Sequence, residues 1–486
     1  MQAPWAVEEM KTLKLKDARL NKRLVRVLDA LAHQPSASIP GACGGAAEIM
    51  AGYRLFDNEK VTFEEVLEPH IVKTRERIAA QRYVVLAQDT TEIDLTRPEQ
   101  QVEGAGPLDG DSRRGVLLHL MHAFTPDGTP QGTIHAAITV RSDEKPTNST
   151  KTRGERQAIP IEDKESYRWL IALRQAQEEA RRQPATQFIC VADSEGDIYE
   201  LLVEAVEGPD NAHWIVRACQ DRALQKNCGE KTQLIGSVRV QLLAAPALYQ
   251  DKITVRGRKA KVSCEHRGRR QPRETREANV EVRAARVTLR PPYRPDRRLP
   301  PITVNAVIVR ELNPPKGETA VEWMLLGDLP IDTLEQVRAF VAYYTTRWMI
   351  EVFFRTLKSG CRVEGRRFEH IDRFVRCLSV YLIVTWRTLY VCRLGRSCPD
   401  ISCEAVFEPS EWKSVYRVVL GKSPAKPPKL QAMIRVVAQL GGYVNRKRDD
   451  PPGPQTVWLG IQRLHDINLC WLTFGPGARA NGAELV

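Results

Sequence analysis

Two short apolar runs, each followed by an aspartate, constrain the fold of this chain more than any other feature. The runs are Tyr83–Ala87 (YVVLA) and Phe188–Ala192 (FICVA), and each has the length and composition of a buried strand. Asp89 comes two residues after the first run, and Asp193 comes directly after the second. Strand ends are rigid platforms, so a carboxylate at that position is well placed for a site. Taken alone, such an aspartate is more often a turn or cap residue.

A third carboxylate lies in Tyr343–Lys358, a stretch without Gly or Pro that predicts one continuous helix. At about 100° per residue, four polar side chains share an arc of roughly 60° on this helix: Tyr344, Arg347, Glu351 and Lys358. Arginine and lysine donate hydrogen bonds to phosphate, and glutamate suits a hard cation. In isolation the arc is equally well explained as a solvated face with an i,i+4 Arg–Glu pair. Two aspartates elsewhere in the chain make the site interpretation the stronger one.

The spacing Tyr344-x2-Arg347-x3-Glu351-x6-Lys358 resembles the YREK signature of the insertion-sequence-four family of bacterial transposases. The similarity covers nearly the whole chain and includes two further stretches, EDKES at Glu162–Ser166 and NPPKGET at Asn313–Thr319. Two buried strands that each deliver an aspartate, followed by a helix that delivers a glutamate, have the order of a ribonuclease-H-like integrase core. The expected fold is therefore α/β, with such a core carrying a β-rich insertion and flanked by helical domains.

This resemblance implies a DDE transposase whose catalytic, metal-binding carboxylates map onto Asp89, Asp193 and Glu351. Carboxylate oxygens suit Mg²⁺, for which Mn²⁺ can substitute, and two such ions per active site serve phosphodiester chemistry. Positions that the resemblance assigns to DNA are Tyr344, Arg347, Lys358, Trp323, Arg217, Tyr53 and Arg54. Neighbouring carboxylates are interpreted as structural: Glu92, Asp94, Glu195 and Asp197.

The implied reaction is cut-and-paste transposition by nicking at the transposon end, hairpin formation, hairpin resolution and strand transfer of 3′-hydroxyl ends. The implied partners are the inverted repeats at the transposon ends, the target DNA, and a second copy of the chain in a paired-end complex. The implied location is the bacterial cytoplasm, in association with the nucleoid. Two alternatives remain open, a stand-alone metal-dependent nuclease of the same fold and a binding-only inhibitor of transposition.

Composition agrees with a nucleic-acid partner. The chain of 486 residues is too long for one ordinary core, and its net charge of +12 favours a polyanionic partner. Its eleven cysteines form no paired framework, which predicts free thiols in a reducing cytosol. No run approaches the ~18–20 apolar residues that a membrane span needs, so no membrane association is expected.

Residues 1–70 are predicted to form an all-helical domain. Asp17 can cap a helix with an apolar stripe, Ser38–Phe56 predicts a glycine-punctuated turn followed by a helix, and Thr62-x-x-Glu65 matches a capping box. Basic helices joined by tight turns suit DNA contact, although a small bundle with a basic exterior explains them equally well. The resemblance implies that this domain recognises transposon ends, with Tyr53 and Arg54 in its most similar stretch.

Residues 71–373 are predicted to form the catalytic domain, with a β-rich insertion at about 221–330. Strands are expected at Val116–Phe124, Thr133–Val140, Val238–Leu243, Lys252–Val255, Val280–Leu289, Ile302–Val309 and Trp323–Leu326. A helix is expected at Glu165–Glu179. The basic stretch Arg256–Arg276 favours a DNA-backbone patch over a merely solvated loop. The resemblance implies that Trp323 stacks on a flipped base and that Arg217 holds phosphate, while a core tryptophan remains the alternative for Trp323.

Residues 374–486 return to helices. Arg376–Leu394 is strongly apolar and is expected to pack on the core, and further helices are expected at Leu430–Gly441 and Val457–Ile467. Composition by itself indicates only a helical subdomain, whereas the resemblance implies a dimerisation domain.

Overall fold

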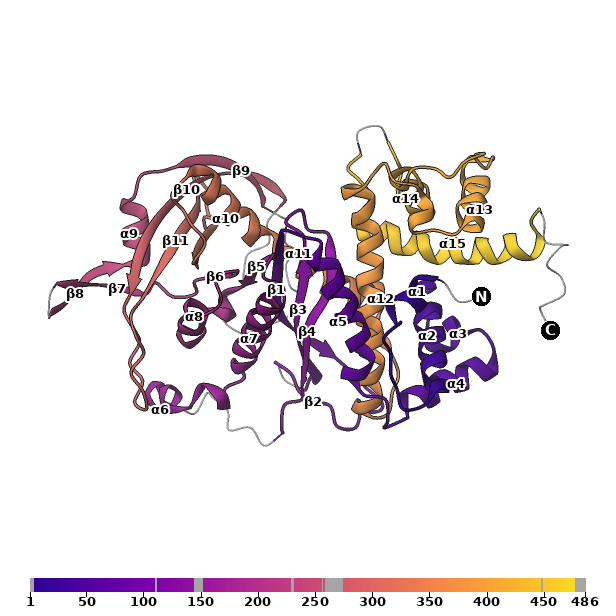
Figure 1. Cartoon of the computed structure of the whole chain (residues 1–486), viewed down its shortest axis with the longest axis horizontal. Coiled ribbons are helices and arrows are strands. Elements are labelled where there is room, and N and C mark those ends of the chain that lie inside the picture. The colour runs from indigo at the N-terminus through magenta and orange to yellow at the C-terminus, as the bar shows by residue number, and fades with distance from the viewer. Residues whose placement is uncertain are drawn as a thin grey trace. The chain divides into compact units, whose positions relative to one another are not determined.

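The computed structural model describes residues 4–109, 112–143, 152–228, 231–255, 257, 274–446 and 449–476. The chain forms two compact units, labelled by their elements in Figure 1. The first unit combines Met1–Pro146 with Trp348–Val486, and the second is Thr147–Arg347. The two ends of the chain therefore belong to one unit, although they are far apart in sequence.

The N-terminal part of the first unit consists of helices α1 (Pro4–Glu9), α2 (Ala18–His33), α3 (Ile39–Cys43), α4 (Ala46–Phe56) and α5 (Phe63–Ala79). The predicted caps are confirmed, because the Asp17 carboxylate accepts a hydrogen bond from the Arg19 N–H and Thr62 forms a reciprocal capping box with Glu65. Gly44 separates α3 from α4 with φ of +79°, a conformation that favours glycine. The apolar stripe of α2 is buried and consists of Leu20, Leu24, Val27, Leu28 and Leu31.

An antiparallel sheet in the first unit contains β1 (Tyr83–Asp94), β2 (Gly106–Pro107), β3 (Arg114–Phe124) and β4 (Pro130–Thr139). β3 pairs with β1, with β2 and with β4, so the strands expected at 116–124 and 133–140 are confirmed. Asp89 does not end its strand as expected. Pairing with β3 continues through the β-branched residues Thr90, Thr91 and Ile93, so Asp89 lies in the middle of a twelve-residue strand.

The rest of the first unit is helical: α11 (Trp348–Arg355), η3 (Thr356–Gly360), η4 (Val363–Gly365), α12 (Ile371–Ser397), η5 (Cys403–Ala405), α13 (Pro409–Leu420), α14 (Leu430–Leu440) and α15 (Pro454–Phe474). α12, orange in Figure 1, contacts α5, β4, α2, α14 and α15. By length and composition alone, α12 is long and apolar enough to cross a membrane, and it is the one described helix that is. However, 78% of its apolar window is buried inside the protein, as in a core helix.

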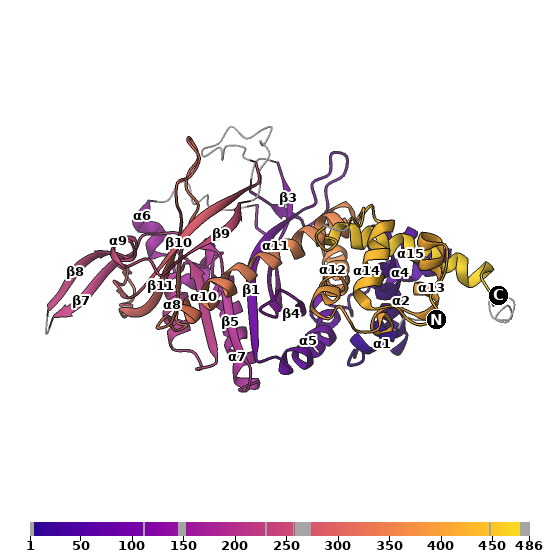
Figure 2. The ribbon, with the colours of Figure 1, turned by 90° about the horizontal axis from the view of Figure 1, so that it is seen from above.

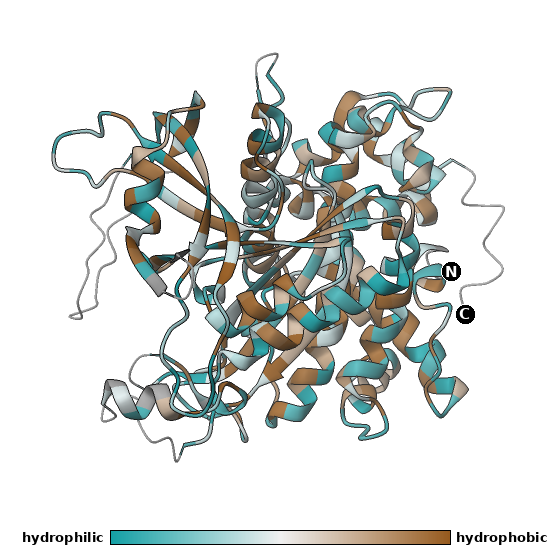
Figure 3. Ribbon diagram, turned by 60° about the vertical axis from the view of Figure 1, so that its left-hand side comes forward, coloured by the Kyte–Doolittle hydropathy of each residue, from teal (hydrophilic) through white to brown (hydrophobic). Residues whose placement is uncertain are grey.

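The strands of the second unit run in the order β5 (Gln187–Ala192), β6 (Ala212–Arg217), β12 (Glu322–Gly327), β11 (Ile302–Glu311), β10 (Arg276–Leu289), β7 (Ala223–Cys228) and β8 (Lys231–Ser237), with β9 (Tyr249–Val255) also paired to β10. β5 and β6 are parallel, and the other pairs are antiparallel. Figure 2 shows the β7–β8 hairpin extending away from the other strands of this unit. In Figure 3, brown apolar residues run along the strands.

The helices of the second unit are α6 (Arg153–Ala158), η1 (Ile161–Asp163), α7 (Tyr167–Arg182), η2 (Ser194–Gly196), α8 (Tyr199–Val206), α9 (Val238–Ala244) and α10 (Leu334–Thr346). α9 overturns the strand expected at 238–243. Val238 and Leu242 are its buried residues, and their spacing of four places both on one face of a helix. The other expected strands are confirmed, whereas most of the basic stretch 256–276 lies outside the described residues. The cysteines whose side chains are described are all free thiols, as predicted.

Candidate active site

Asp89 and Glu351 belong to two elements of the first unit that pack together, β1 and α11. Both side chains are half-buried. The Asp89 Oδ1 atom accepts a hydrogen bond of 2.8 Å from the Thr90 N–H, and the Thr90 hydroxyl lies 2.9 Å from Nδ1 of His119 on β3. The middle of a paired strand therefore holds one candidate carboxylate, and the first turn of a packed helix holds the other.

The stretch Tyr343–Lys358 is not one continuous helix. α10 ends at Thr346, where the hydroxyls of Thr345 and Thr346 both donate to the Ala342 carbonyl, a contact that often bends helices. α11 begins at Trp348, and the unit boundary falls between Arg347 and Trp348. Tyr344 and Arg347 therefore belong to the second unit, whereas Glu351 and Lys358 belong to the first.

Lys358 lies in η3, a π-helical turn that follows α11. The Cys361 N–H donates to the Thr356 carbonyl over 2.8 Å, and this five-residue spacing closes a turn wider than an α-helical one. Lys358 thus departs from the 100° spacing that placed it on an arc with Glu351. Its ammonium donates to the Glu92 carbonyl on β1 and lies 3.5 Å from the Glu364 carboxylate.

The carboxylates of Glu92 and Asp94 are bound by an arginine. Arg113 donates to Glu92 Oε2 at 2.7 Å and to Asp94 Oδ2 at 2.9 Å. Burial opposes ionisation of Asp94, but hydrogen bonds from Thr96 and Arg113 outweigh it and lower the pKa of this carboxyl. These contacts agree with the structural role expected for both residues. They also fix the end of β1 to which Lys358 bonds.

Asp193 follows β5 directly, as predicted, and caps η2 by accepting a hydrogen bond of 2.8 Å from the Glu195 N–H. Nearby Asp197 pairs with the Arg222 guanidinium and receives the Cys219 N–H at 2.9 Å, which makes it structural.

The second unit also brings the predicted DNA-contacting residues Tyr344, Arg347, Arg217 and Trp323 together. The Trp323 and Tyr344 ring centroids are 6.0 Å apart, and the Arg347 guanidinium lies 5.8 Å from the Tyr344 ring. Burial raises the pKa of the Tyr344 hydroxyl, the Arg347 and Arg217 charges counteract this rise, and Asp193 adds to it. Arg347, Arg217 and Asp193 therefore act electrostatically on Tyr344, and Trp323 contacts its ring.

Sequence reasoning missed two arginines beside Trp323. Arg239 of α9 donates to Glu322 Oε1 at 2.8 Å, and Arg310 of β11 lies 3.7 Å from Glu322 Oε2. Arg217 donates to the Glu322 carbonyl at 3.3 Å. Three arginines thus hold Glu322, the residue that precedes Trp323. Their contacts fix β12, the strand that carries the half-buried Trp323 indole. No sequence signal pointed to Arg239, because its segment was expected to be a strand.

Tyr53 and Arg54 lie on α4, where Tyr53 is half-buried and Arg54 is exposed. Burial raises the pKa of the Tyr53 hydroxyl. A cleft of about 430 Å³ between α2 and the α3–α4 segment has a basic wall made of Arg19, Lys22, Arg23 and Arg26. Four basic side chains of the N-terminal helices are therefore gathered on one helix, α2.

The three candidate carboxylates fit a hard cation by their chemistry, since all offer oxygen ligands and Asp89, Asp193 and Glu351 are all half-buried. Within the described part of either unit, no group of three or more His, Cys, Asp or Glu side chains forms a metal cluster by itself. Asp89 and Glu351 belong to one unit and Asp193 to the other.

Comparison with known proteins gives two domain matches. Residues 2–61 match a transposase DNA-binding domain, and residues 383–470 match the dimerisation domain of transposase Tn5. Among solved structures, the piggyBac transposase in a synaptic complex with hairpin DNA is similar at 9% identity and a TM-score of 0.30, a likeness too distant to support an inference. The match covers 82% of this chain, which spans 60% of the length of that one. A transposase DNA-binding domain at one end and a Tn5-type dimerisation domain at the other support a Tn5-like transposase of the insertion-sequence-four family.

Proposed function

We propose that this protein is a DDE transposase that excises a DNA element and joins its 3′-hydroxyl ends to target DNA. The observation that carries the proposal is the pair of domain matches, which flank the segment containing Asp89, Asp193 and Glu351. A DNA-binding domain and a dimerisation domain on either side of an acidic triad suit an enzyme that brings two DNA ends together before cutting them.

In this proposal, Asp89, Asp193 and Glu351 hold two Mg²⁺ ions, for which Mn²⁺ can substitute. When bound, these ions lower the pKa of the attacking water or 3′-hydroxyl and stabilise charge on the leaving oxygen. The Arg347 and Arg217 guanidiniums and the Lys358 ammonium hold DNA phosphates, and the Tyr344 hydroxyl orients the strand.

The proposed reaction is a series of in-line displacements at one site. Water nicks the transposon end, and the freed 3′-hydroxyl then attacks the opposite strand to form a hairpin. A second water opens the hairpin, and the 3′-hydroxyl finally attacks the target DNA. Trp323 stacks on a base that leaves the helix when the hairpin forms.

The triad is tested by single substitutions Asp89→Ala, Asp193→Ala and Glu351→Ala, assayed on duplexes that carry the inverted repeats flanking the coding sequence. Each variant is expected to lose Mg²⁺-dependent nicking while binding the duplex as the wild-type protein does, because each change removes a metal ligand and no recognition contact. Glu195→Gln is the matched control, since this exposed carboxylate lies two residues from Asp193. Nicking by any of the three alanine variants means that the residue is wrongly assigned.

The same assay separates the two alternatives. A stand-alone nuclease cuts the donor duplex but joins no 3′-hydroxyl end to a target plasmid. A binding-only inhibitor shifts the duplex in a gel and cuts nothing. Joined products from the wild-type protein exclude both.

A further inference from the structure

Arg366 is a buried arginine that is held by backbone carbonyls. It is 6% exposed, and no carboxylate among the described residues lies within 4.0 Å of its guanidinium. The guanidinium donates to the carbonyls of Ala37, Cys361 and Pro35, the last at 2.9 Å, and lies 4.7 Å from the Tyr381 ring. A buried charge is costly unless it is hydrogen-bonded. The position of Arg366 is therefore tied to these three carbonyls.

The three carbonyls belong to two separate segments of the first unit, the η3 turn and the connection between α2 and α3. Cys361 closes the π-helical turn η3, which carries Lys358. Pro35 and Ala37 belong to the connection between α2 and α3, within the segment that matches a transposase DNA-binding domain. One side chain thus bonds the connection between DNA-binding helices to the turn that holds a candidate phosphate-binding lysine.

Other contacts hold the Arg366 loop and the 34–37 connection in place. Phe368, two residues after Arg366, packs edge-to-face on Phe56 at the end of α4, with ring centroids 6.0 Å apart. The Gln462 amide of α15 donates to the Ser36 hydroxyl at 2.5 Å, and Gln34 donates to Asp466 of α15 at 3.4 Å. The connection at residues 34–37 is thereby contacted by Arg366 and by α15 of the matched dimerisation domain, while Phe368 joins the Arg366 loop to α4.

We propose that Arg366 is a positioning residue that couples binding of end DNA by α2–α4 to the position of Lys358. The inference rests on the proposed function. A shift of residues 35–37 on DNA binding moves the guanidinium, because its charge has no carboxylate to hold it in place. The movement reaches the Cys361 carbonyl at the end of a π-helical turn, a rare conformation often found at functional sites. Coupling is reciprocal, so a phosphate on Lys358 favours the arrangement of α2–α4 that binds the end.

A kinetic experiment compares Arg366→Met and Arg366→Lys with the wild-type protein. Arg366→Met is expected to bind the end duplex within about threefold of wild type but to nick it at least tenfold more slowly at saturating duplex. Arg366→Lys keeps the charge but not the fork of donors, so its nicking rate is expected to be intermediate. Arg97→Met is the matched control. Arg97 donates to the carbonyls of Glu364 and Arg366, so it supports the loop that carries Arg366, but it has no bond to residues 35–37. A proportional loss of binding and nicking, or an equally slow Arg97→Met protein, overturns the inference.

A second measurement does not depend on cleavage. Lys358 is labelled with an amine-reactive reagent and quantified by mass spectrometry, with and without a duplex that stops short of the cleavage junction and places no phosphate on Lys358. The duplex is expected to change labelling at least threefold in the wild-type protein and not in Arg366→Met, while the exposed Lys422 is labelled equally throughout. Equal changes in both proteins, or no change in either, overturn the inference. A wild-type protein that cuts no DNA overturns the proposed function instead, and the labelling still tests the coupling.

Discussion

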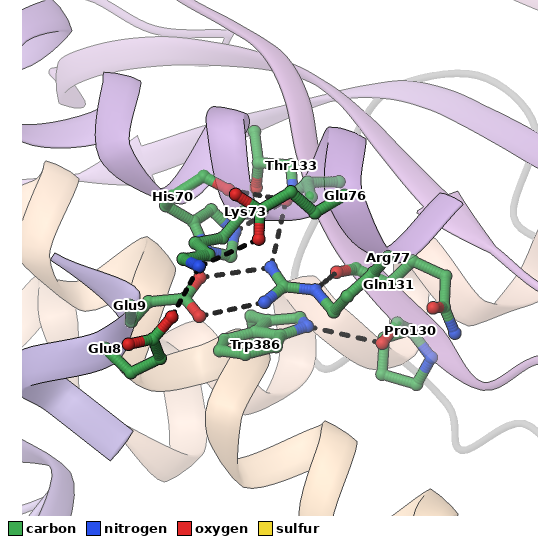
Figure 4. Close-up of polar contacts among 11 residues, drawn as sticks. Glu8, Glu9, His70, Lys73, Glu76, Arg77, Pro130, Gln131, Thr133 and Trp386 are labelled. Atoms are coloured by element: carbon green, nitrogen blue, oxygen red, sulfur yellow. Dashed lines mark hydrogen bonds and ion pairs between the residues drawn. The ribbon is translucent and has the colours of Figure 1, made fainter. Parts of the chain in front are cut away.

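At the scale of single residues, Glu9 joins α1 to α5 through hydrogen bonds and ion pairs with His70 and Arg77 (Figure 4). Its buried carboxylate contacts Nδ1 of His70 at 2.5 Å and receives two hydrogen bonds from Arg77, at 2.8 and 3.0 Å. The Thr133 N–H donates to Nε2 of His70 at 3.1 Å, so Nε2 carries no proton, and the neutral ring donates from Nδ1 to Glu9. Burial lowers the pKa of His70, which favours this neutral form.

The first prediction is that Glu9 makes the stability of the first unit depend on acidity. Burial opposes its charge, but His70 and Arg77 outweigh burial and lower the pKa of Glu9 from 4.5 to about 2. Because the folded-state pKa is the lower one, the stabilisation is complete above about pH 4.5 and is lost as the pH falls towards 2. Its size is on the order of 3 kcal/mol. Denaturant unfolding should show that wild type has a larger free energy of unfolding than Glu9→Gln above about pH 4.5. This difference should shrink as the pH falls towards 2. Glu8→Gln, which alters an exposed carboxylate, should show little difference from wild type at any pH. A difference for Glu9→Gln that does not change with pH contradicts the prediction.

The second prediction concerns Trp323. Base stacking is worth about 1–3 kcal/mol, so Trp323→Ala should permit the first nick but slow hairpin formation roughly ten- to hundred-fold, and Trp323→Phe should be milder. Gel analysis of the strands after single turnover measures both steps. Tyr293→Ala removes an aromatic ring that is 76% exposed in the same unit and should change neither step. Unfolding of the Trp323→Ala protein would instead assign the indole to the core.

At the scale of elements, close approach of α14 and α15 depends on glycine. A Cβ atom at Gly460 would lie 2.0 Å from the Val437 carbonyl, and one at Gly441 would lie 1.9 Å from the Thr456 carbonyl. Both obstacles are backbone atoms, which cannot rotate away as a side chain can. The two helices therefore pack closely only because these positions carry no side chain.

The third prediction follows from this packing. Gly460→Ala should destabilise the first unit by about 1–3 kcal/mol, because the helices must separate to admit the methyl group. Gly453→Ala is the control in the same helix region, since a Cβ there meets no atom within 4 Å. Thermal unfolding followed by circular dichroism compares the two proteins. Equal melting temperatures would mean that α14 and α15 are less tightly packed than the structure indicates.

At the scale of the whole molecule, α15 presents an apolar surface near its end. Leu469, Leu472 and Phe474 are 50%, 53% and 84% exposed, and the first two lie within or beside the matched dimerisation domain. Other α15 residues are buried, since Val457 and Leu464 join a cluster with Val391 and Cys392 of α12. Removing everything after Leu420 would therefore open the core, and surface substitutions test dimerisation more cleanly than truncation.

The fourth prediction is that Leu469→Glu combined with Leu472→Glu abolishes the dimer without unfolding the protein, because charge on a self-complementary apolar face repels its copy. Sedimentation in the presence of end duplex should then detect single-end complexes only, and no double-strand break should form. Val444→Glu alters a residue that is 67% exposed outside the helices and should leave the dimer intact. A double variant that still pairs two ends would place the dimer contact elsewhere.

Sequence alone determined the features that depend on neighbouring residues and on family signature. Local hydrogen bonds determine the caps of α2 and α5, and apolar patterning determines the buried stripe of α2 and the strands β1 and β5. All of these could be predicted from the sequence, and the YREK spacing could be recognised from residue identity alone. Around Tyr344 the second unit gathers Asp193, Arg347, Arg217 and Trp323, whose roles stay predictions.

Only the tertiary structure decided how those elements are interrupted and joined. It ended α10 at Thr346, gave Lys358 a π-helical turn, continued β1 beyond Asp89 and made a helix of residues 238–244. It also joined Arg366 to Pro35 and Ala37, and Glu9 to His70 and Arg77. The physical reason is that each outcome depends on hydrogen bonds or strand pairing between segments distant in sequence, or on competition for a single carbonyl. Patterns of residue type along the chain do not encode which of those partners meet.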